Sequence, residues 1–277
     1  MSTHRQVYDI SANRMRSLDP RELWHYRHLV FLLAWRNVRV RYKQTVLGLL
    51  WALLAPVAFT AIFVVFFRLV PVKPVGELPY VPAALTGMVL WQFFSRALTD
   101  AGSSLSGNAN LITKVYFPRL VLPLSAVASG LADFMVSLGM LALVLAWFGI
   151  VPPPQLVLAP AFVLLTALLV VALSLWLSAI DGLFRDVRHV VPLVLQLGMF
   201  GSPVAYTTAA LVPERWRWLY EWNPMVAALD GLRWSLLPGA VPPGVDAVAK
   251  SVGLTLALLV GGILFFASVE RTVVDRV

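Results

Sequence analysis

The sequence contains no cysteine and few charged residues. Only 13% of its 277 residues are charged, about half of the roughly 25% found in soluble domains. The absence of cysteine excludes a disulfide framework, a Cys-ligated zinc site and a thiol nucleophile. Hydrophobic residues make up 59% of the chain, and the mean hydropathy is +0.79. This composition excludes a cytosolic enzyme, a disordered protein and a secreted scaffold, and it indicates a membrane protein.

Long runs without charge predict the membrane spans. A helix needs about 20 apolar residues to cross a bilayer core of roughly 30 Å. The longest run is divided by Pro152, Pro153 and Pro154, which end a helix. The runs are apolar on all sides, unlike the alternating strands of a barrel, so they are predicted to be helices. The sequence therefore predicts an all-α integral membrane protein with six transmembrane helices. The predicted spans are 46–69, 80–101, 120–150, 156–180, 189–209 and 251–269.

The distribution of Lys and Arg predicts the orientation. An even number of spans places both termini on one side. With the N-terminus inside, the inner segments contain 15 of the 22 Lys and Arg residues and the outer segments contain five. The positive-inside rule therefore favours an N-in, C-in topology. Because topology explains the net charge of +8, nucleic acid is not an expected partner.

Residues 1–45 are predicted to form a cytoplasmic tail and an amphipathic interfacial helix, and residues 46–277 the transmembrane domain. The segment 21–44 mixes Trp, Tyr, Phe and Leu with basic residues. Such a segment is expected to lie in the inner headgroup layer, among membrane lipids. No apolar core with a small-residue cleavage site precedes it, so a signal peptide is not expected.

Two inner segments have unusual compositions. Residues 102–119 begin with small polar residues, continue with an apolar and basic pattern and close at Pro118. The apolar residues favour a short helix that lies against the inner membrane surface or against a docked protein. The alternative is a polar loop. Residues 181–192 alternate two carboxylates and two arginines. They form either a contact surface for a cytosolic partner or a solvated turn whose salt pairs contribute little.

The outer segment 201–250 predicts short re-entrant helices. Gly201-Ser202-Pro203 breaks the fifth span, and four Trp residues and a Tyr follow within 216–234. Trp and Tyr favour the headgroup level. Asn223-Pro224 starts an apolar stretch too short to span, in which Asp230 and Arg233 are three apart and can pair on one helix face. We expect two half-inserted helices that border a water-accessible cavity.

Catalytic and cofactor motifs are absent from the sequence. It has no intact phosphate-binding loop, no HExxH and no Asp-rich metal box. We therefore predict no catalytic residue, no metal site and no cofactor bound by this chain. Asp133, near the middle of the third span, is costly in lipid and is a functional hypothesis by default. The alternative is a hydrogen bond to the backbone or a Ser of a neighbouring span.

Several of these segments resemble one known family. They read WRNVRVRYKQTVLGLLWALLAP (35–56), GNANLITKVYFPR (107–119) and FRDVRHVVP (184–192), with shorter matches at 202–204, 212–217, 223–225 and 270–271. They resemble permease subunits of ABC-2 type exporters of polysaccharides and polyol phosphates. The order of the motifs also matches. The sequence differs at Asp181-Gly182-Leu183, where the family pattern has Asn followed by a larger apolar residue.

The resemblance implies a six-span permease that forms a homodimer in the bacterial cytoplasmic membrane. Each copy would bind one cytosolic ABC ATPase subunit, which carries the ATP and Mg²⁺ and drives export of a lipid-linked glycan such as O-antigen, capsule or teichoic acid. Two inner coupling segments would contact the ATPase, although anchoring to the membrane surface is the alternative. The candidate coupling residues are Asn108, Asn110, Lys114, Tyr116 and Arg119 in the first segment, and Arg185, Asp186 and Arg188 in the second.

Aromatic side chains offer a candidate path for sugar rings. Phe59, Phe63 and Phe67 share one face of the first predicted span, and Tyr206 lies near the broken fifth span. Packing against lipid or other helices is the alternative.

Two other functions remain open from the sequence. One is an ABC-2 exporter of small hydrophobic molecules or free lipids. The other is a membrane enzyme acting on lipid-linked sugars, for which Glu214, Glu221 and Asp230 are the available acidic group.

Overall fold

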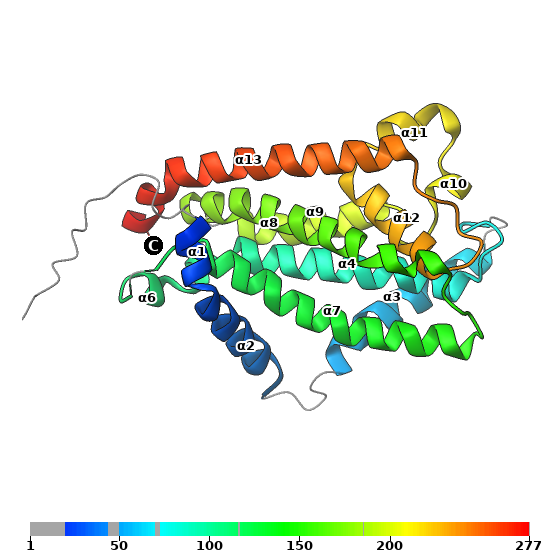
Figure 1. Ribbon diagram of the computed structural model, residues 1–277, viewed down its shortest axis with the longest axis horizontal. Helices are drawn as coiled ribbons and strands as arrows, with labels where there is room; N and C mark the ends of the chain where they lie inside the picture. Colours follow the sequence, from blue (N-terminus) through cyan, green and yellow to red (C-terminus); the bar gives the residue numbers. More distant parts are fainter. Residues whose placement is uncertain (1–19, 44–49, 70–72, 116, 185, 277) are drawn as a thin grey trace, which may run out of the picture.

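The chain folds into a bundle of helices (Figure 1). The computed structural model describes residues 20–43, 50–69, 73–115, 117–184 and 186–276, and within these ranges it contains helices and turns but no strand, which confirms the all-α prediction. The helices are α1 Pro20–His25, α2 Arg27–Lys43, α3 Leu50–Leu69, α4 Tyr80–Gly102, α5 Ser104–Gly107, α6 Ala109–Ile112, α7 Val121–Trp147, η2 Pro154–Leu158, α8 Ala159–Leu183, α9 Val187–Phe200, α10 Thr208–Leu211, α11 Glu214–Tyr220, α12 Pro224–Leu236 and α13 Val245–Arg276.

Helix α4 is the centre of the bundle. It packs against α3, α7, α8 and α12, and 16 of its 23 residues are buried. Small residues allow the helices to cross closely. This is usual in membranes, because the hydrophobic effect does not drive helices together in lipid and close packing does. A Cβ at Gly130 of α7 would lie 2.9 Å from Ala97 of α4, and one at Gly262 of α13 would lie 3.0 Å from the Ala172 carbonyl of α8.

Three helical stretches are long and apolar enough to cross a membrane: Val121–Trp147, Pro154–Leu183 and Val245–Val269. They overlap the predicted third, fourth and sixth spans. The apolar stretches Leu53–Leu69 and Val187–Phe200 are shorter. Helix α4 is long, but it carries Arg96 and Asp100. Both have charged neighbours, because Asp100 pairs with Arg41 and Arg96 lies 3.9 Å from Asp133.

The predicted fifth span differs most from the structure. It was expected over 189–209, but α9 ends at Phe200, and Gly201 begins a non-helical segment. Pro203 has no backbone N–H to continue a helix. The 14 residues of α9 extend about 21 Å at 1.5 Å per residue, which is short of a bilayer core of about 30 Å.

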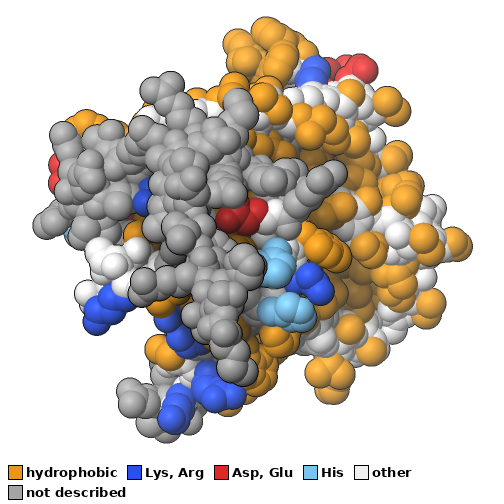
Figure 2. Space-filling model, turned by 60° about the vertical axis from the view of Figure 1, so that its left-hand side comes forward, with side chains coloured by type: hydrophobic (Ala, Val, Ile, Leu, Met, Phe, Trp, Pro, Cys, Tyr) orange, Lys and Arg blue, Asp and Glu red, His pale blue; other side chains and the backbone are white. Residues whose placement is uncertain are grey.

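The two ends of the bundle have different chemistry. We call the end with α1, α6 and the C-terminal part of α13 the basic end, and the end with α10, α11 and α12 the tryptophan end (Figure 1). Both ends of the described chain therefore lie at the basic end. Figure 2 turns this end toward the viewer and shows Lys, Arg and His side chains gathered on it, beside a hydrophobic flank.

The basic end has a hydrophobic cluster of its own. It joins Leu33 of α2, Leu105 of α5, Val121 of α7, Ala179 of α8 and Phe266 of α13. The side chain of Leu105 is buried, with 2% exposure. The first inner segment is therefore packed onto the bundle, so the polar-loop interpretation of this segment is wrong.

Candidate functional site

The first predicted coupling segment is held to helix α2. Arg36 Nη2 donates a hydrogen bond to Asn108 Oδ1 at 2.8 Å, and Asn108 Nδ2 donates to the Ser104 carbonyl at 2.9 Å. Asn110 and Lys114 are exposed. Arg119 is half-buried, and Tyr116 lies outside the described residues. Asn108 therefore positions the segment, while Asn110 and Lys114 face outward.

The second predicted coupling segment meets the first at Asp181. Arg188 Nε donates to Asp181 Oδ1 at 2.9 Å, and the Ser106 hydroxyl donates to Asp181 Oδ2. Asp186 is exposed on the same segment, and Arg185 lies outside the described residues. The sequence predicted the two segments separately. Their contact through a buried carboxylate becomes visible only in the structure.

Asp133 is bound by the N-terminal helix α2. Arg41 Nη1 pairs with Asp133 Oδ2, and Tyr42 donates its hydroxyl to Asp133 Oδ1 at 2.7 Å. Arg41 Nη2 also pairs with Asp100 at 2.6 Å, and Arg96 lies 3.9 Å from Asp133. These partners are side chains of α2 and α4, whereas the alternative considered from the sequence was the backbone or a Ser of a neighbouring span. A carboxylate in lipid needs a cationic partner. That requirement could have pointed to Arg41 or Arg96 from the sequence.

The proposed aromatic path is divided by the structure. Phe63 packs against Phe200, with ring centroids 6.1 Å apart, and Phe67 packs against Tyr80 at 5.6 Å. Phe59 is 38% exposed. Phe63 and Phe67 are half-buried in ring contacts, whereas Phe59 is more exposed, and their role as a path for sugar rings stays a prediction.

Tyr206 forms hydrogen bonds at the non-helical segment that follows α9. Its hydroxyl donates to the Phe200 carbonyl at 3.0 Å and lies 2.8 Å from the Tyr220 hydroxyl. Burial raises the pKa of the Tyr220 phenol. Tyr206 thus satisfies a carbonyl that the end of α9 leaves without a helical partner.

The predicted pair of Asp230 and Arg233 is confirmed, with Nη1 and Oδ1 2.9 Å apart. Arg233 is more deeply placed than the sequence indicated, because its side chain is 1% exposed. It also donates to the carbonyls of Ala83 at 3.0 Å and of Pro203 and Val204, each at 2.9 Å. Burial raises the pKa of Asp230, and Arg233 opposes that shift. The guanidinium joins α4, α12 and the broken segment.

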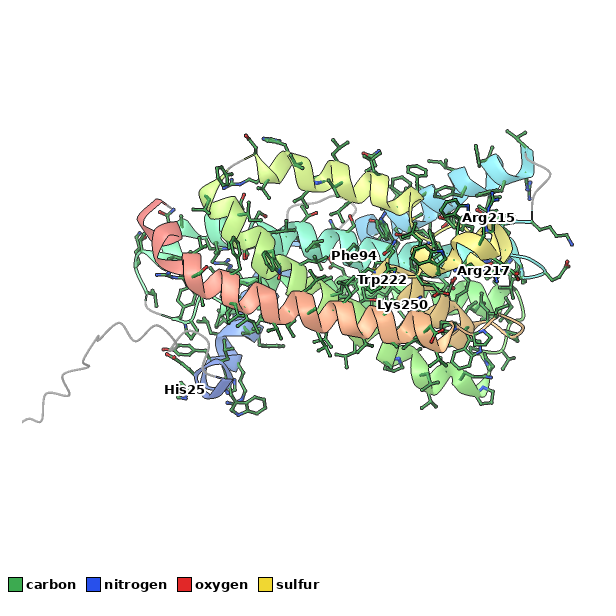
Figure 3. All side chains as sticks on the ribbon, turned by 90° about the horizontal axis from the view of Figure 1, so that it is seen from above. His25, Phe94, Arg215, Arg217, Trp222 and Lys250 are labelled. Atoms are coloured by element: carbon green, nitrogen blue, oxygen red, sulfur yellow. The ribbon has the colours of Figure 1, made fainter. Side chains whose placement is uncertain are left out.

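Glu214 and Glu221 at the tryptophan end have basic neighbours. Lys250 binds Glu221 at 2.8 Å, and Arg217 lies 3.8 Å from the exposed Glu214. Figure 3 shows Arg217 and Lys250 at this end, opposite His25 of α1. A cavity of about 540 Å³ is lined by Glu221, Arg217 and Asp230 among others. Within the described part of the chain, no group of three His, Asp or Glu residues could hold a metal ion.

Comparison with known proteins identifies the family. The model of the family described as ABC-2 type transporter matches residues 28–237. The chain belongs to this family. The match takes in both predicted coupling segments and the break after α9.

Named relatives of this ABC-2 chain are export proteins. It is 34% identical over 210 residues to the O-antigen export system permease protein RfbA of Myxococcus xanthus, covering 76% of this chain and 80% of that protein. It is 28% identical over 232 residues to a protein of the same name from Klebsiella pneumoniae, covering 83% and 88%. It is 24% identical over 238 residues to the polysialic acid transport protein KpsM of Escherichia coli, covering 83% and 89%. The resemblance found in the sequence is thereby confirmed.

Proposed function

We propose that this chain is the permease subunit of an ABC exporter that moves a lipid-linked polysaccharide, such as an O-antigen-like glycan, across the cytoplasmic membrane of a bacterium. A separate cytosolic ATPase binds ATP and Mg²⁺ and supplies the energy, and the chain itself carries out no chemistry. The relatives named for O-antigen and polysialic acid export support the substrate class.

One structural observation carries this proposal. The two inner segments are joined at Asp181 and rest on a hydrophobic cluster, so they form one ordered surface at the basic end. Asn110, Lys114, Asp186 and Arg188 lie on its accessible side. A motor protein needs such a surface, because a freely solvated loop would absorb its movement. We assign this surface to the ATPase.

Six spans, an N-in, C-in topology and a homodimer complete the proposal. The basic end would face the cytosol, in agreement with the positive-inside rule. The exposed tryptophans of α11, Trp216 and Trp218, would lie at the outer headgroup level. Phe59 remains the candidate of the aromatic set for contact with the sugar rings, since the ring of Phe59 is accessible.

The alternatives have less support. An enzyme would need a group of carboxylates available to substrate. Glu221 and Asp230 are each bound to a cation, which leaves Glu214 as the exposed member of the three. An exporter of small hydrophobic molecules would share the fold. The two exporters differ in the substrate that accumulates when the chain is missing: a lipid-linked polymer for one and a small hydrophobic molecule for the other.

The test is depletion of the chain in its own bacterium. We expect surface polysaccharide to disappear and the lipid-linked polymer to accumulate on the inner side, with both effects reversed by the wild-type chain. The chain purified in mild detergent should bring down an ABC ATPase at one-to-one stoichiometry. Normal surface polysaccharide together with changed resistance to hydrophobic toxins would contradict the proposal and favour the small-molecule exporter.

The lack of cysteine allows a direct test of orientation. A membrane-impermeant maleimide applied to whole cells should label Glu214→Cys at the tryptophan end and should leave Thr113→Cys at the basic end unlabelled until the membrane is opened. Both side chains are exposed, so accessibility within the protein is matched. The reverse pattern would contradict the assigned topology.

A further inference from the structure

Asp181 is a carboxylate in an unfavourable position. It lies in the last turn of α8, which ends at Leu183, and its side chain is only 1% exposed. The C-terminus of a helix carries partial negative charge, which disfavours a carboxylate there. Burial adds a further cost unless the charge is paired and hydrogen-bonded. The position is therefore maintained by specific partners.

The two partners of Asp181 come from the two predicted coupling segments. Arg188, in the first turn of α9, binds one carboxylate oxygen at 2.9 Å. Ser106 of α5, 75 residues before Asp181 in the chain, donates its hydroxyl to the other oxygen. Hydrogen bonds to an ionised acceptor are about twice as strong as neutral ones. One side chain thus ties both segments to the end of α8.

The same surface continues into helix α2. Asn108, two residues after Ser106, accepts a hydrogen bond from Arg36 at 2.8 Å. The end of α2 carries Arg41, which binds Asp133 of α7 and Asp100 of α4. A displacement of the first segment therefore reaches the interior of α7 through side-chain contacts that are all present in the structure.

We infer that Asp181 is a positioning residue that makes the two coupling segments move as one body. This inference depends on the proposed function, because it specifies how the ATPase-facing surface acts. A push on either segment is shared through Asp181 with α8 and α9, and through Asn108 and Arg36 with α2. The carboxylate suits this task because both of its oxygens accept at once, one from a cation and one from a hydroxyl.

A purely stabilising role predicts a different result. In that case, removal of Asp181 would lower the melting temperature or the abundance of the protein, and the surviving protein would export normally. The positioning role predicts protein that assembles and hydrolyses ATP but exports less polymer per ATP. The export yield per ATP and the separation of the two segments therefore distinguish the two roles.

The experiment uses the full chain in complex with its ATPase, reconstituted in lipid. Spin labels are attached at Thr113→Cys and His189→Cys, two exposed positions on the two segments, with no native cysteine to interfere. Pulsed electron resonance measures the distance distribution between the labels with and without ATP and vanadate. Export per ATP is measured in parallel on the unlabelled chain.

We expect a narrow distribution in the wild type, with or without trapped nucleotide. In Asp181→Ala the distribution should broaden at least about twofold, and export per ATP should fall at least about fivefold, while ATPase binding is kept. Asp181→Asn should recover part of the yield, because an amide can accept from Arg188 and donate to Ser106. Ser268→Ala is the control at the basic end, since this exposed hydroxyl bonds only within its own helix in the described contacts.

An unchanged distribution and an unchanged yield in Asp181→Ala would overturn the inference. If that variant does not fold, Ser106→Ala and Asp181→Asn provide the same test, and wild-type behaviour in both would overturn it equally. Failure of the proposed function has a separate sign: the wild-type chain itself would not bind an ATPase.

Discussion

Two buried charges at opposite ends of the bundle are held in different ways. Arg233 at the tryptophan end and Asp181 at the basic end each have a side chain that is 1% exposed. Arg233 is bound by three backbone carbonyls and by Asp230 of its own helix. Asp181 is bound by two side chains, and Arg188 is 43% exposed. The first charge is enclosed by the backbone, and the second is connected to the surface.

This difference indicates two roles: Arg233 holds helices in place, and Asp181 transmits movement between segments. Backbone carbonyls can leave Arg233 only if α4, α12 and the broken segment move apart, so this centre keeps one geometry. The side chains on Asp181 belong to two segments that can move together with the end of α8 without unfolding a helix. The structure thus places a centre fixed by the backbone at the tryptophan end. At the surface proposed for the ATPase it places a centre of side chains that joins two segments and can move with them.

The strongest way to break the comparison is Arg233→Met. The change leaves three carbonyls and the Asp230 carboxylate without their donor in the protein interior. Removal of one partner of a buried ion pair costs about 3–5 kcal/mol, so we expect a large fall in melting temperature in detergent and loss from the membrane. Arg215→Met is the matched control, because Arg215 is exposed on α11 of the same end. Equal melting of the two variants would remove the structural role assigned to Arg233.

A smaller effect is expected from Gly87→Ala. A Cβ at Gly87 would lie 2.1 Å from the Val204 carbonyl oxygen and 2.6 Å from Arg233 Nη2. Overpacking of this kind costs about 1–3 kcal/mol, and here it also displaces Arg233. Gly139→Ala on α7 is the control, since a Cβ there meets nothing within 4 Å. Thermal unfolding should show a loss for the first and none for the second; a loss for both would indicate a general intolerance of added methyl groups.

The smallest effect is expected from Lys73→Gln. Lys73 pairs with Glu77 at 2.6 Å in a loop, but the two side chains are 71% and 88% exposed. Exposed pairs contribute about 0–1 kcal/mol, so the melting temperature should stay close to that of the wild type. This result would show that a charged pair stabilises this protein strongly only where it is buried, as Arg233 is. A shift as large as that of Arg233→Met would contradict this account.

The sequence predicted those features that depend on local pattern. Long apolar runs are sufficient for α7, α8 and α13, because the bilayer requires length and hydrophobicity of each helix separately. The pairing of Asp230 and Arg233 follows from a spacing of three on one helix. The two inner segments were recognised by composition and by the family resemblance. Their roles as coupling segments remain predictions.

The sequence did not predict contacts between distant residues. Arg41 meets Asp133 across 92 positions, and Arg233 meets the Ala83 carbonyl across 150. The break at Gly201-Ser202-Pro203 was predicted, but the span was drawn on to residue 209, whereas α9 ends at Phe200. Hydropathy reports the preference of a segment for lipid. The stop of the helix comes instead from Gly201 and Pro203, which hydropathy does not weigh.

The sequence by itself determined that this protein is a helical membrane protein, which end of it is basic, and to which family it belongs. These properties depend on the composition and local order of residues, so they can be recognised without knowing which distant residues are in contact. Tertiary structure decided which charge binds which. Asp133 and Asp181 each needed a cation, but several arginines were available, and only the packing of α2, α5 and α9 against the bundle brought Arg41 to one and Arg188 to the other.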